Sequence, residues 1–310
     1  MIKRFKELTF FQILFDSIKN FGKSDSMIFS AGTAFYTIFS LPAFLIIILN
    51  IGSTFYKESR IKEEILSQVG ELAGEESVAT LENIMENITQ SSGGMISNII
   101  AIFVLGFSAT TVFVSLQNAI NHIWHIKAKP EKGILKFIIN RLLSFSMVAS
   151  IGFILLVSLV LDALIIVLFT YFDYFLESVT VYLVSIIHLV LAQALLVVIF
   201  ALMYKILPDA KVRWRDTWMG AFVTMILFAA GKYLIGFYMG NTDFASAYGT
   251  AGSLVVLLVW VYYSVVIFLF GAQITYYIAV KTGGDIIPLS QAVKVELREV
   301  EESDESLADN

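Results

Sequence analysis

Three ionisable side chains interrupt long apolar stretches of the sequence, and they are the first residues that could do chemistry. They are Asp162, His188 and Lys232. A titratable group inside a lipid bilayer is costly, so its presence favours a role in substrate binding or proton transfer. His188 is predicted near the membrane midplane, where an imidazole can contact a proton or a substrate. The alternative is a neutral histidine that hydrogen-bonds to a neighbouring helix, the role predicted for Gln193 in the same stretch.

Asp162 and Lys232 are predicted to lie at similar heights in the membrane. At about 1.5 Å per residue, Asp162 lies ~30 Å and Lys232 ~27 Å beyond the inner ends of their helices. One interpretation is an ion pair across the interior of the helical bundle. A second is that Lys232 extends to the outer interface, as long cationic side chains do, while Asp162 meets water there. A third is contact with a substrate.

A second polar group gathers where apolar stretches end on one side of the membrane. Its members are Gln117, Asn118, Asn121 and Gln273 near the ends of stretches, and Arg141, Asp209, Arg213, Arg215 and Asp216 in the adjacent loops. If these ends meet, the residues line an inward-facing vestibule in which arginines can hold a phosphate with two hydrogen bonds. The alternative is a solvated cationic face in ordinary contact with lipid headgroups.

Tyr36 and Pro42 belong to the first apolar stretch. Pro42 is predicted to kink it, because proline removes a helical hydrogen bond and neighbouring helices must satisfy the freed carbonyl. Tyr36 is predicted to line, with His188, a cavity that reaches the midplane. The candidate substrate pathway therefore consists of Tyr36, Pro42, Asn121, Arg141, Asp162, His188, Arg213, Asp216, Lys232 and Gln273.

Several kinds of chemistry have no visible support. The chain has no cysteine, which excludes disulfides and thiol nucleophiles, and only three histidines, His122, His125 and His188. There is no phosphate-binding glycine loop, no serine-nucleophile motif and no carboxylate pair suited to acid–base catalysis. We therefore expect no enzyme activity, no catalytic residue, no metal site, no cofactor and no nucleic-acid partner.

The elements that must position these residues are membrane helices. Of the 310 residues, 57% are hydrophobic and 15% charged, whereas a soluble domain is about half apolar and a quarter charged. The apolar residues fall in runs of about 20 or more, enough to cross hydrocarbon. The spans run from Met27 to Phe55, Ile96 to Ala119, Leu142 to Tyr171, Val179 to Tyr204, Trp214 to Met239 and Ala247 to Val280. The sequence predicts an all-α polytopic membrane protein with six transmembrane helices.

Lysine and arginine set the orientation, because cytoplasmic loops carry an excess of both. They gather before the first span and after the second and fourth, and are absent after the third and fifth. Both termini are therefore predicted to be cytoplasmic. Residues 1–25 are predicted to form an interfacial amphipathic helix or one docked on the bundle, and 26–282 the membrane domain. Within it, the acidic outer loop 56–94 is expected to form short helices that cap the bundle, and 283–310 to form a disordered acidic tail.

Four short segments stand out by their residue types and order. They are Ala34 to Pro42; Thr110 to Trp124, in which Trp124 follows Asn121 by three residues; Leu207 to Asp216 with Gly220 and Ala221; and Tyr248-Gly249, Trp260 and Gly271-Ala272. Together, over about residues 30–282, they resemble the YihY/BrkB family of bacterial inner-membrane proteins. The family usually has glutamate after Gly-Ala in the last span, where this chain has Gln273, so a proton-handling role for that carboxylate does not carry over.

The resemblance implies a location in the bacterial cytoplasmic membrane. An older label for the family, ribonuclease BN, looks like a misassignment, and His122 and His125 have no acidic ligand beside them in their loop. Members have been linked to virulence and to envelope or lipid transport.

Three functions remain open. The first is a transporter or permease, with an amphipathic or anionic envelope component as its substrate. The second is a non-transporting membrane scaffold or assembly factor that uses the acidic loop and tail as docking surfaces. The third, a membrane-bound enzyme, is disfavoured. Expected partners are membrane lipids, an unidentified lipid or small-molecule substrate, and a second copy of the chain in a homo-oligomer.

Overall fold

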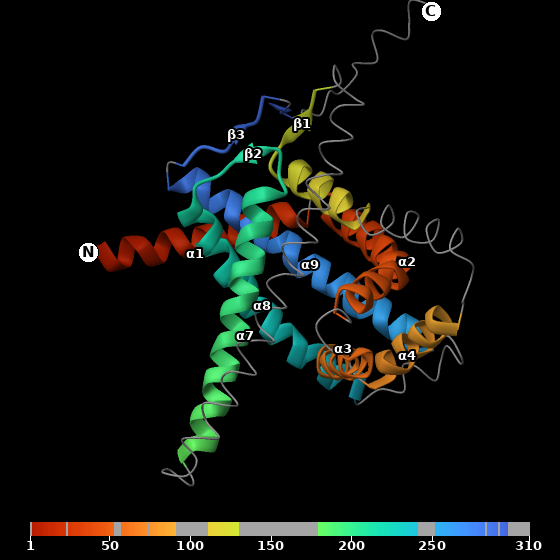
Figure 1. The fold of residues 1–310 in the computed structure, drawn as a ribbon. Helices are drawn as coiled ribbons and strands as arrows, with labels where there is room; N and C mark the ends of the chain where they lie inside the picture. Colours follow the sequence, from red (N-terminus) through yellow and green to blue (C-terminus); the bar gives the residue numbers. More distant parts are fainter. Residues whose placement is uncertain are drawn as a thin grey trace, which may run out of the picture.

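The computed structural model describes residues 2–22, 24–52, 57–73, 75–90, 111–129, 179–240, 252–282, 284–290 and 292–296 (Figure 1). Its helices are α1 (Ile2–Phe21), α2 (Ser26–Gly52), α3 (Glu58–Ala73), α4 (Glu75–Gln90), α7 (Val179–Ile206), α8 (Trp214–Gly240) and α9 (Gly252–Lys281). Residues 111–123 are also helical. The strands are β1 (Ile126–Ala128), β2 (Ala210–Lys211), β3 (Ile287–Pro288) and β4 (Ala292–Lys294).

Three helices within the described residues are long and apolar enough to cross a membrane. Their apolar windows are Leu189–Ile206 in α7, Trp214–Ile235 in α8 and Gly252–Lys281 in α9. α2 occupies the first predicted span, and the helix continues on both sides of Pro42. The third predicted span, with Arg141 at its inner flank, and residues 96–110 of the second lie outside the described residues.

α9 is the central helix of the described structure. It contacts α8, α2, α1 and α4, and in Figure 1 it runs through the middle of the molecule. The contact with α8 is close because each helix places a glycine opposite a threonine of the other. A Cβ on Gly220 would lie 1.8 Å from Thr275 Oγ1, and a Cβ on Gly271 would lie 1.9 Å from Thr224 Oγ1. Small residues at a crossing let two backbones approach, which favours helix packing in membranes.

The two threonines at this crossing satisfy their own hydroxyl groups. Each donates a 2.8 Å hydrogen bond to a carbonyl one turn earlier in its own helix, Thr224 to Gly220 and Thr275 to Gly271. A hydroxyl bonded in this way needs no partner on the other helix. The crossing is thus close-packed without leaving these hydroxyls unsatisfied.

The N-terminal helix is docked on α9 by one face. Ile13 and Phe21 are buried there, and Lys281 Nζ lies 2.5 Å from Asp16 Oδ2. The other face exposes Phe11 and Phe15. An apolar face turned outward beside a membrane helix is typical of an interfacial helix, so docking and interfacial placement are compatible.

Two amphipathic helices form in the first loop, as the sequence predicts. α3 and α4 pack on each other and contact α2 and α9. Leu81 and Met85 of α4 are buried in the core, whereas Glu58, Glu63 and Glu82 are exposed. The apolar periodicity of the loop therefore identified the faces that pack on the bundle.

The prediction of a disordered tail over residues 283–310 is wrong for its first part. β3 pairs antiparallel with β2, with Ile287 opposite Lys211, and β4 pairs antiparallel with β1, with Val293 opposite Lys127. We call residues 284–296 the C-terminal strap. The strap is ordered because Ile286 and Ala292 are buried and its backbone finds partners in two existing turns. Four short strands thus accompany the helices, and residues 297–310 lie outside the described part.

Candidate functional site

The strap and the turns that it pairs with lie at one end of the helices, where several of the predicted polar residues gather. The turn between α7 and α8 supplies Asp209, whose side chain is 2% exposed. Asn121 Nδ2 donates to Asp209 Oδ2 at 2.9 Å, and Asp209 N donates to Asn121 Oδ1 at 2.9 Å. Gln117 Nε2 adds a longer contact of 3.4 Å to Asp209 Oδ1. Hydrogen bonds to an ionised carboxylate are stronger than neutral ones, so these amides tie segment 111–123 to the turn.

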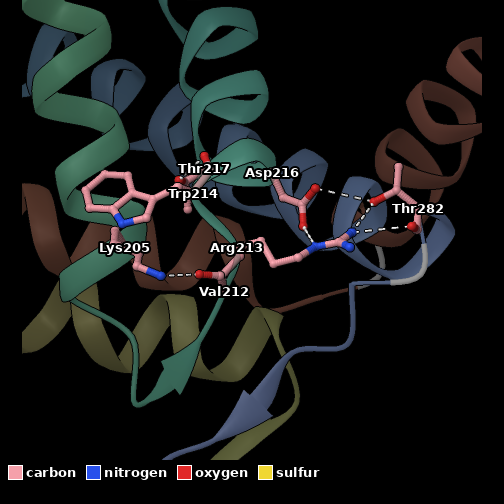
Figure 2. A network of polar contacts seen from close by, with 7 residues as sticks. All are labelled: Lys205, Val212, Arg213, Trp214, Asp216, Thr217 and Thr282. Carbon is pink, nitrogen blue, oxygen red and sulfur yellow. Dashed lines mark hydrogen bonds and ion pairs between the residues drawn. The ribbon is translucent and has the colours of Figure 1, made fainter.

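A second polar network joins the start of α8 to the end of α9 (Figure 2). Arg213 Nε donates to Asp216 Oδ2 at 3.0 Å, and an Arg213 terminal nitrogen donates to Thr282 Oγ1 at 2.9 Å. Thr282 Oγ1 lies 3.3 Å from Asp216 Oδ1. Gly284 makes room for the guanidinium, since a Cβ there would lie 2.2 Å from an arginine nitrogen. Asp216 is almost completely buried, so Arg213 balances a carboxylate that water does not reach.

The turn is braced on its other side by Lys205. Its ammonium donates to the carbonyl of Val212 and lies 5.4 Å from the ring centroid of Trp214. A cation over an indole face is attracted by the ring quadrupole. The rings of Trp214 and Trp218 have centroids 6.4 Å apart, and both side chains are exposed. Figure 2 shows Lys205 and Arg213 reaching to opposite sides of the loop.

Buried hydrogen bonds hold the helices beneath these turns. Trp124 Nε1 donates to the carbonyl of Ala272 at 2.9 Å, and the Tyr204 hydroxyl donates to the carbonyl of Phe268 at 2.7 Å. Gln273 is buried beside Ala272. Trp124 and Tyr204 each satisfy a carbonyl of α9, which fixes the inner half of that helix.

His125 marks the passage from segment 111–123 into β1. Its backbone φ is 56°, a left-handed conformation that is uncommon for residues other than glycine, although histidine adopts it more often than most. Its pKa is lowered, first by burial and then by the positive charges that His122 and Lys294 can carry. Its Nδ1 is buried and has no hydrogen-bond partner among the described residues. The neutral imidazole is therefore the favoured form.

The remaining predicted pathway residues are spread over the structure. Tyr36 is exposed on α2, and Lys232 is half-buried on α8. His188 lies in α7, while Arg141 and Asp162 lie outside the described residues. Of the predicted pathway residues, Asn121, Arg213, Asp216 and Gln273 lie toward the end of the described structure that holds the α7–α8 turn.

One polar atom of α7 lacks, among the described residues, the hydrogen-bond partner that the sequence predicts. Gln193 Oε1 of α7 is buried, and no described residue donates a hydrogen bond to it. The sequence predicted an interhelical bond for this side chain. Its position marks it: 14 residues of α7 precede it, beginning with Val179, and 13 follow it, ending with Ile206, so Gln193 lies at the middle of the helix.

The packed apolar helices, with their polar residues gathered at one end, define a helical membrane protein. The chain belongs to the family described as virulence factor BrkB, whose sequence pattern matches residues 17–293. This confirms the resemblance seen in the sequence.

Curated relatives are membrane proteins. A UPF0761 membrane protein of Psychrobacter sp. is 25% identical over 290 residues, 92% of this chain and 51% of that protein. One of Alkalilimnicola ehrlichii is 26% identical over 261 residues, 82% of this chain and 55% of that one. The UPF0761 membrane protein YihY of Salmonella newport is 41% identical over 100 residues, 31% and 32% of the two chains. The chain thus spans about half or less of these relatives' length. No solved structure matches.

Proposed function

We propose that this chain is a permease of the bacterial cytoplasmic membrane, with six spans and both termini in the cytoplasm, that moves an amphipathic or anionic envelope component. Gln193 carries the proposal, because its Oε1 is buried and no described residue donates a hydrogen bond to it. A buried acceptor without a donor costs about 1–3 kcal/mol, and more inside hydrocarbon, where no water can replace the missing partner. Leucine at this position would avoid that cost. A polar atom kept at the middle of a membrane helix is explained if a polar or hydrated group passes beside it.

Two further features support the proposal. His188 lies five residues before Gln193 in the same helix, so α7 carries two polar side chains within its central part. The inner turns expose Lys211, Arg213 and Arg215, which suits an anionic solute. The sequence has no nucleotide-binding motif, so movement is passive, ion-coupled or driven by a partner.

The test is translocation in vesicles reconstituted with the purified full chain. The probe is fluorescent phosphatidylglycerol, and its accessibility to an external quencher reports movement between leaflets. We expect faster exchange than in protein-free vesicles and at least a tenfold loss, about 1.4 kcal/mol, in Gln193→Leu. Gln12→Leu, at an exposed position of α1, is the matched control and should exchange like the unmodified chain. The measurement is then repeated with phosphatidylethanolamine and phosphatidylcholine probes. If none of the three lipids exchanges faster than in protein-free vesicles, the proposal is wrong.

The six-span topology is tested separately by reporter fusions. A reporter that is active only in the cytoplasm, fused at Ile2 or after Glu296, should be active in both cases. A reporter inserted at Lys57, before α3, should be inactive. A signal from opposite faces at the two ends would contradict both the orientation and the span count.

A membrane scaffold is the second candidate, favoured by the exposed glutamates of α3 and α4. Glu58, Glu63 and Glu82 present an acidic surface that suits a cationic docking partner. On this hypothesis the acidic residues 297–310 are a second docking element. Deleting these residues should then prevent the truncated chain from complementing a strain that lacks the gene, while lipid exchange in vesicles stays unchanged. A deletion that leaves both intact would weaken the scaffold hypothesis.

A further inference from the structure

One corner of the inner face combines exposed cations with exposed indoles. We call this surface the cationic corner and define it by Lys205, Lys211, Arg213, Trp214, Arg215 and Trp218. Lys211 and Arg215 are exposed, and the Arg213 side chain is half exposed. Trp214 and Trp218 are 47% and 42% exposed. Indoles are usually exposed to this extent only where a membrane or a binding partner covers them.

The carboxylates of the same stretch are turned away from this surface. Between Lys205 and Asp216 the chain has two acidic residues, Asp209 and Asp216. Asp209 accepts hydrogen bonds from Asn121 and Gln117, and Asp216 accepts one from Arg213. Both side chains are almost completely buried. The fold therefore separates the charges of this stretch, with anions inside and cations outside, and leaves a surface that attracts anions.

An apolar stripe leads from the corner along α8. Trp218, Phe222 and Ile226 follow one another at intervals of four residues, which places them on one helix face. All three are exposed, at 42%, 53% and 49%. Because α8 is apolar enough to cross the membrane, the stripe lies at the depth of acyl chains, while the corner lies at the depth of headgroups. Tryptophan with lysine or arginine at such a boundary is the usual interfacial arrangement.

We propose that the cationic corner binds an anionic phospholipid of the cytoplasmic leaflet. The phosphate lies against the exposed side chains of Lys211 and Arg215, and an acyl chain lies along the α8 stripe. The Lys205 ammonium over the Trp214 ring holds that indole in place. The site rests on the position of the α8 N-terminus at the inner leaflet, and it does not require that the chain transports anything.

A phospholipid suits the corner better than a free phosphate. A free phosphate would use the cations alone and leave the indoles and the stripe uncovered. An amphiphile with one anionic end uses both parts of the surface at once. Surface attraction of a basic side chain to anionic lipid is worth about 1 kcal/mol, a factor of about five for each cation.

The experiment uses the tryptophans of the site as local reporters. The full chain is reconstituted in phosphatidylcholine vesicles that contain a small fraction of either brominated phosphatidylglycerol or brominated phosphatidylcholine. Bromine quenches indole fluorescence at short range, so the ratio of the two quenching efficiencies measures local preference for the anionic lipid. We expect clear preference in the unmodified chain and a decrease of about twenty-fivefold in the apparent affinity of K211Q/R215Q.

Three further variants make the outcome decisive. K57Q/K62Q removes two cations beside α3 and should keep the preference. Trp214→Phe with Trp218→Phe should remove most of the differential quenching. Asp285→Asn removes an exposed carboxylate that directly follows Gly284, the residue against the Arg213 guanidinium, and should strengthen the preference.

The proposal is overturned by any of three results. These are no preference in the unmodified chain, an unchanged preference in K211Q/R215Q, or an equal loss in K57Q/K62Q. Displacement of the brominated phosphatidylglycerol by inorganic phosphate would instead identify a free-anion site and would also overturn it. Quenching reports lipid binding and not exchange between leaflets. A negative quenching result therefore leaves the permease proposal standing, and a chain without transport activity can still bind the lipid at the cationic corner.

Discussion

Thr224 of α8 occupies the space that a side chain on Gly271 of α9 would need. Its Oγ1 lies 1.9 Å from the position of a Cβ there, and the Tyr204 hydroxyl lies 2.4 Å from it. Neither neighbour is free to move, because Thr224 bonds to Gly220 and Tyr204 bonds to Phe268. The close approach of the two helices therefore depends on the missing side chain of Gly271, as it does on that of Gly220.

Gly271→Ala should destabilise the protein by about 1–3 kcal/mol, the usual cost of forcing an extra group into a packed interior. The measurement is the thermal unfolding midpoint in detergent. Gly32→Ala is the control, because a Cβ on Gly32 of α2 meets nothing within 4 Å. Replacing a helical glycine without a clash stabilises by about 0.5–1 kcal/mol, so the two glycine-to-alanine changes should have opposite signs.

Asn121→Ala should loosen the link between segment 111–123 and the α7–α8 turn. The change removes two hydrogen bonds to Asp209, one to its buried carboxylate and one from its backbone N–H. The expected loss is about 1.5–3 kcal/mol, the range for a bond to a charged group. The same substitution at Asn118, which is exposed one turn earlier, should cost little. Equal effects at both positions would contradict the role of Asp209.

Stability should fall as the pH drops below about 6.5, in part through His125. The pKa of this imidazole is lower in the folded chain than its ordinary value, so the unfolded chain binds the proton more readily. The contribution is complete above the ordinary pKa of about 6.5 and decreases as the pH falls from there to the lower folded pKa. His125→Asn keeps a residue that tolerates positive φ. It should make the thermal unfolding midpoint depend less on pH over this range. An unchanged pH profile would show that another group is responsible.

Arg213→Gln should weaken the packing of the strap against the α7–α8 turn. It leaves the buried Asp216 carboxylate without its cation, and we expect a loss of about 1–2 kcal/mol, moderated because Arg213 is half exposed to solvent. The readout is hydrogen exchange of the strap amides, such as that of Leu289, which should become faster. Adding Asp216→Asn should restore much of the protection, because a neutral amide needs no cation. Arg215→Gln, on the exposed side, should change nothing in this assay.

The apolar patterning was sufficient to predict the main helices. α7 and α8 begin at Val179 and Trp214, the residues at which the fourth and fifth spans were predicted. The turn between them has Pro208 and several charged residues, which neither continue a helix nor enter hydrocarbon. The sequence also placed polar residues at the ends of these helices, and Asn121, Asp209, Arg213 and Asp216 do lie at one end of them.

The strap and the pairing of the polar residues could not be predicted in this way. Strands of two or three residues, such as β3 and β4, are too short for an alternating pattern. The partner of Arg213 is Asp216, three residues later in the first turn of α8, but Thr282 is the last residue of the predicted membrane domain and Gly284 comes from the predicted disordered tail. Long-range contacts of this kind depend on where the C-terminal end of α9 lies relative to the α7–α8 turn. The local sequence does not determine that position.

The pairing of β1 and β2 with the strap also has a consequence for biosynthesis. The ribosome delivers the edges of β1 and β2 long before residues 284–296 exist to cover them. During that interval the backbone groups of both turns lack their strand partners, and the Asp216 network lacks Thr282. A nascent chain therefore completes this end of the molecule only when residues 284–296 have been synthesised, so the packing of the two turns is a late step of folding.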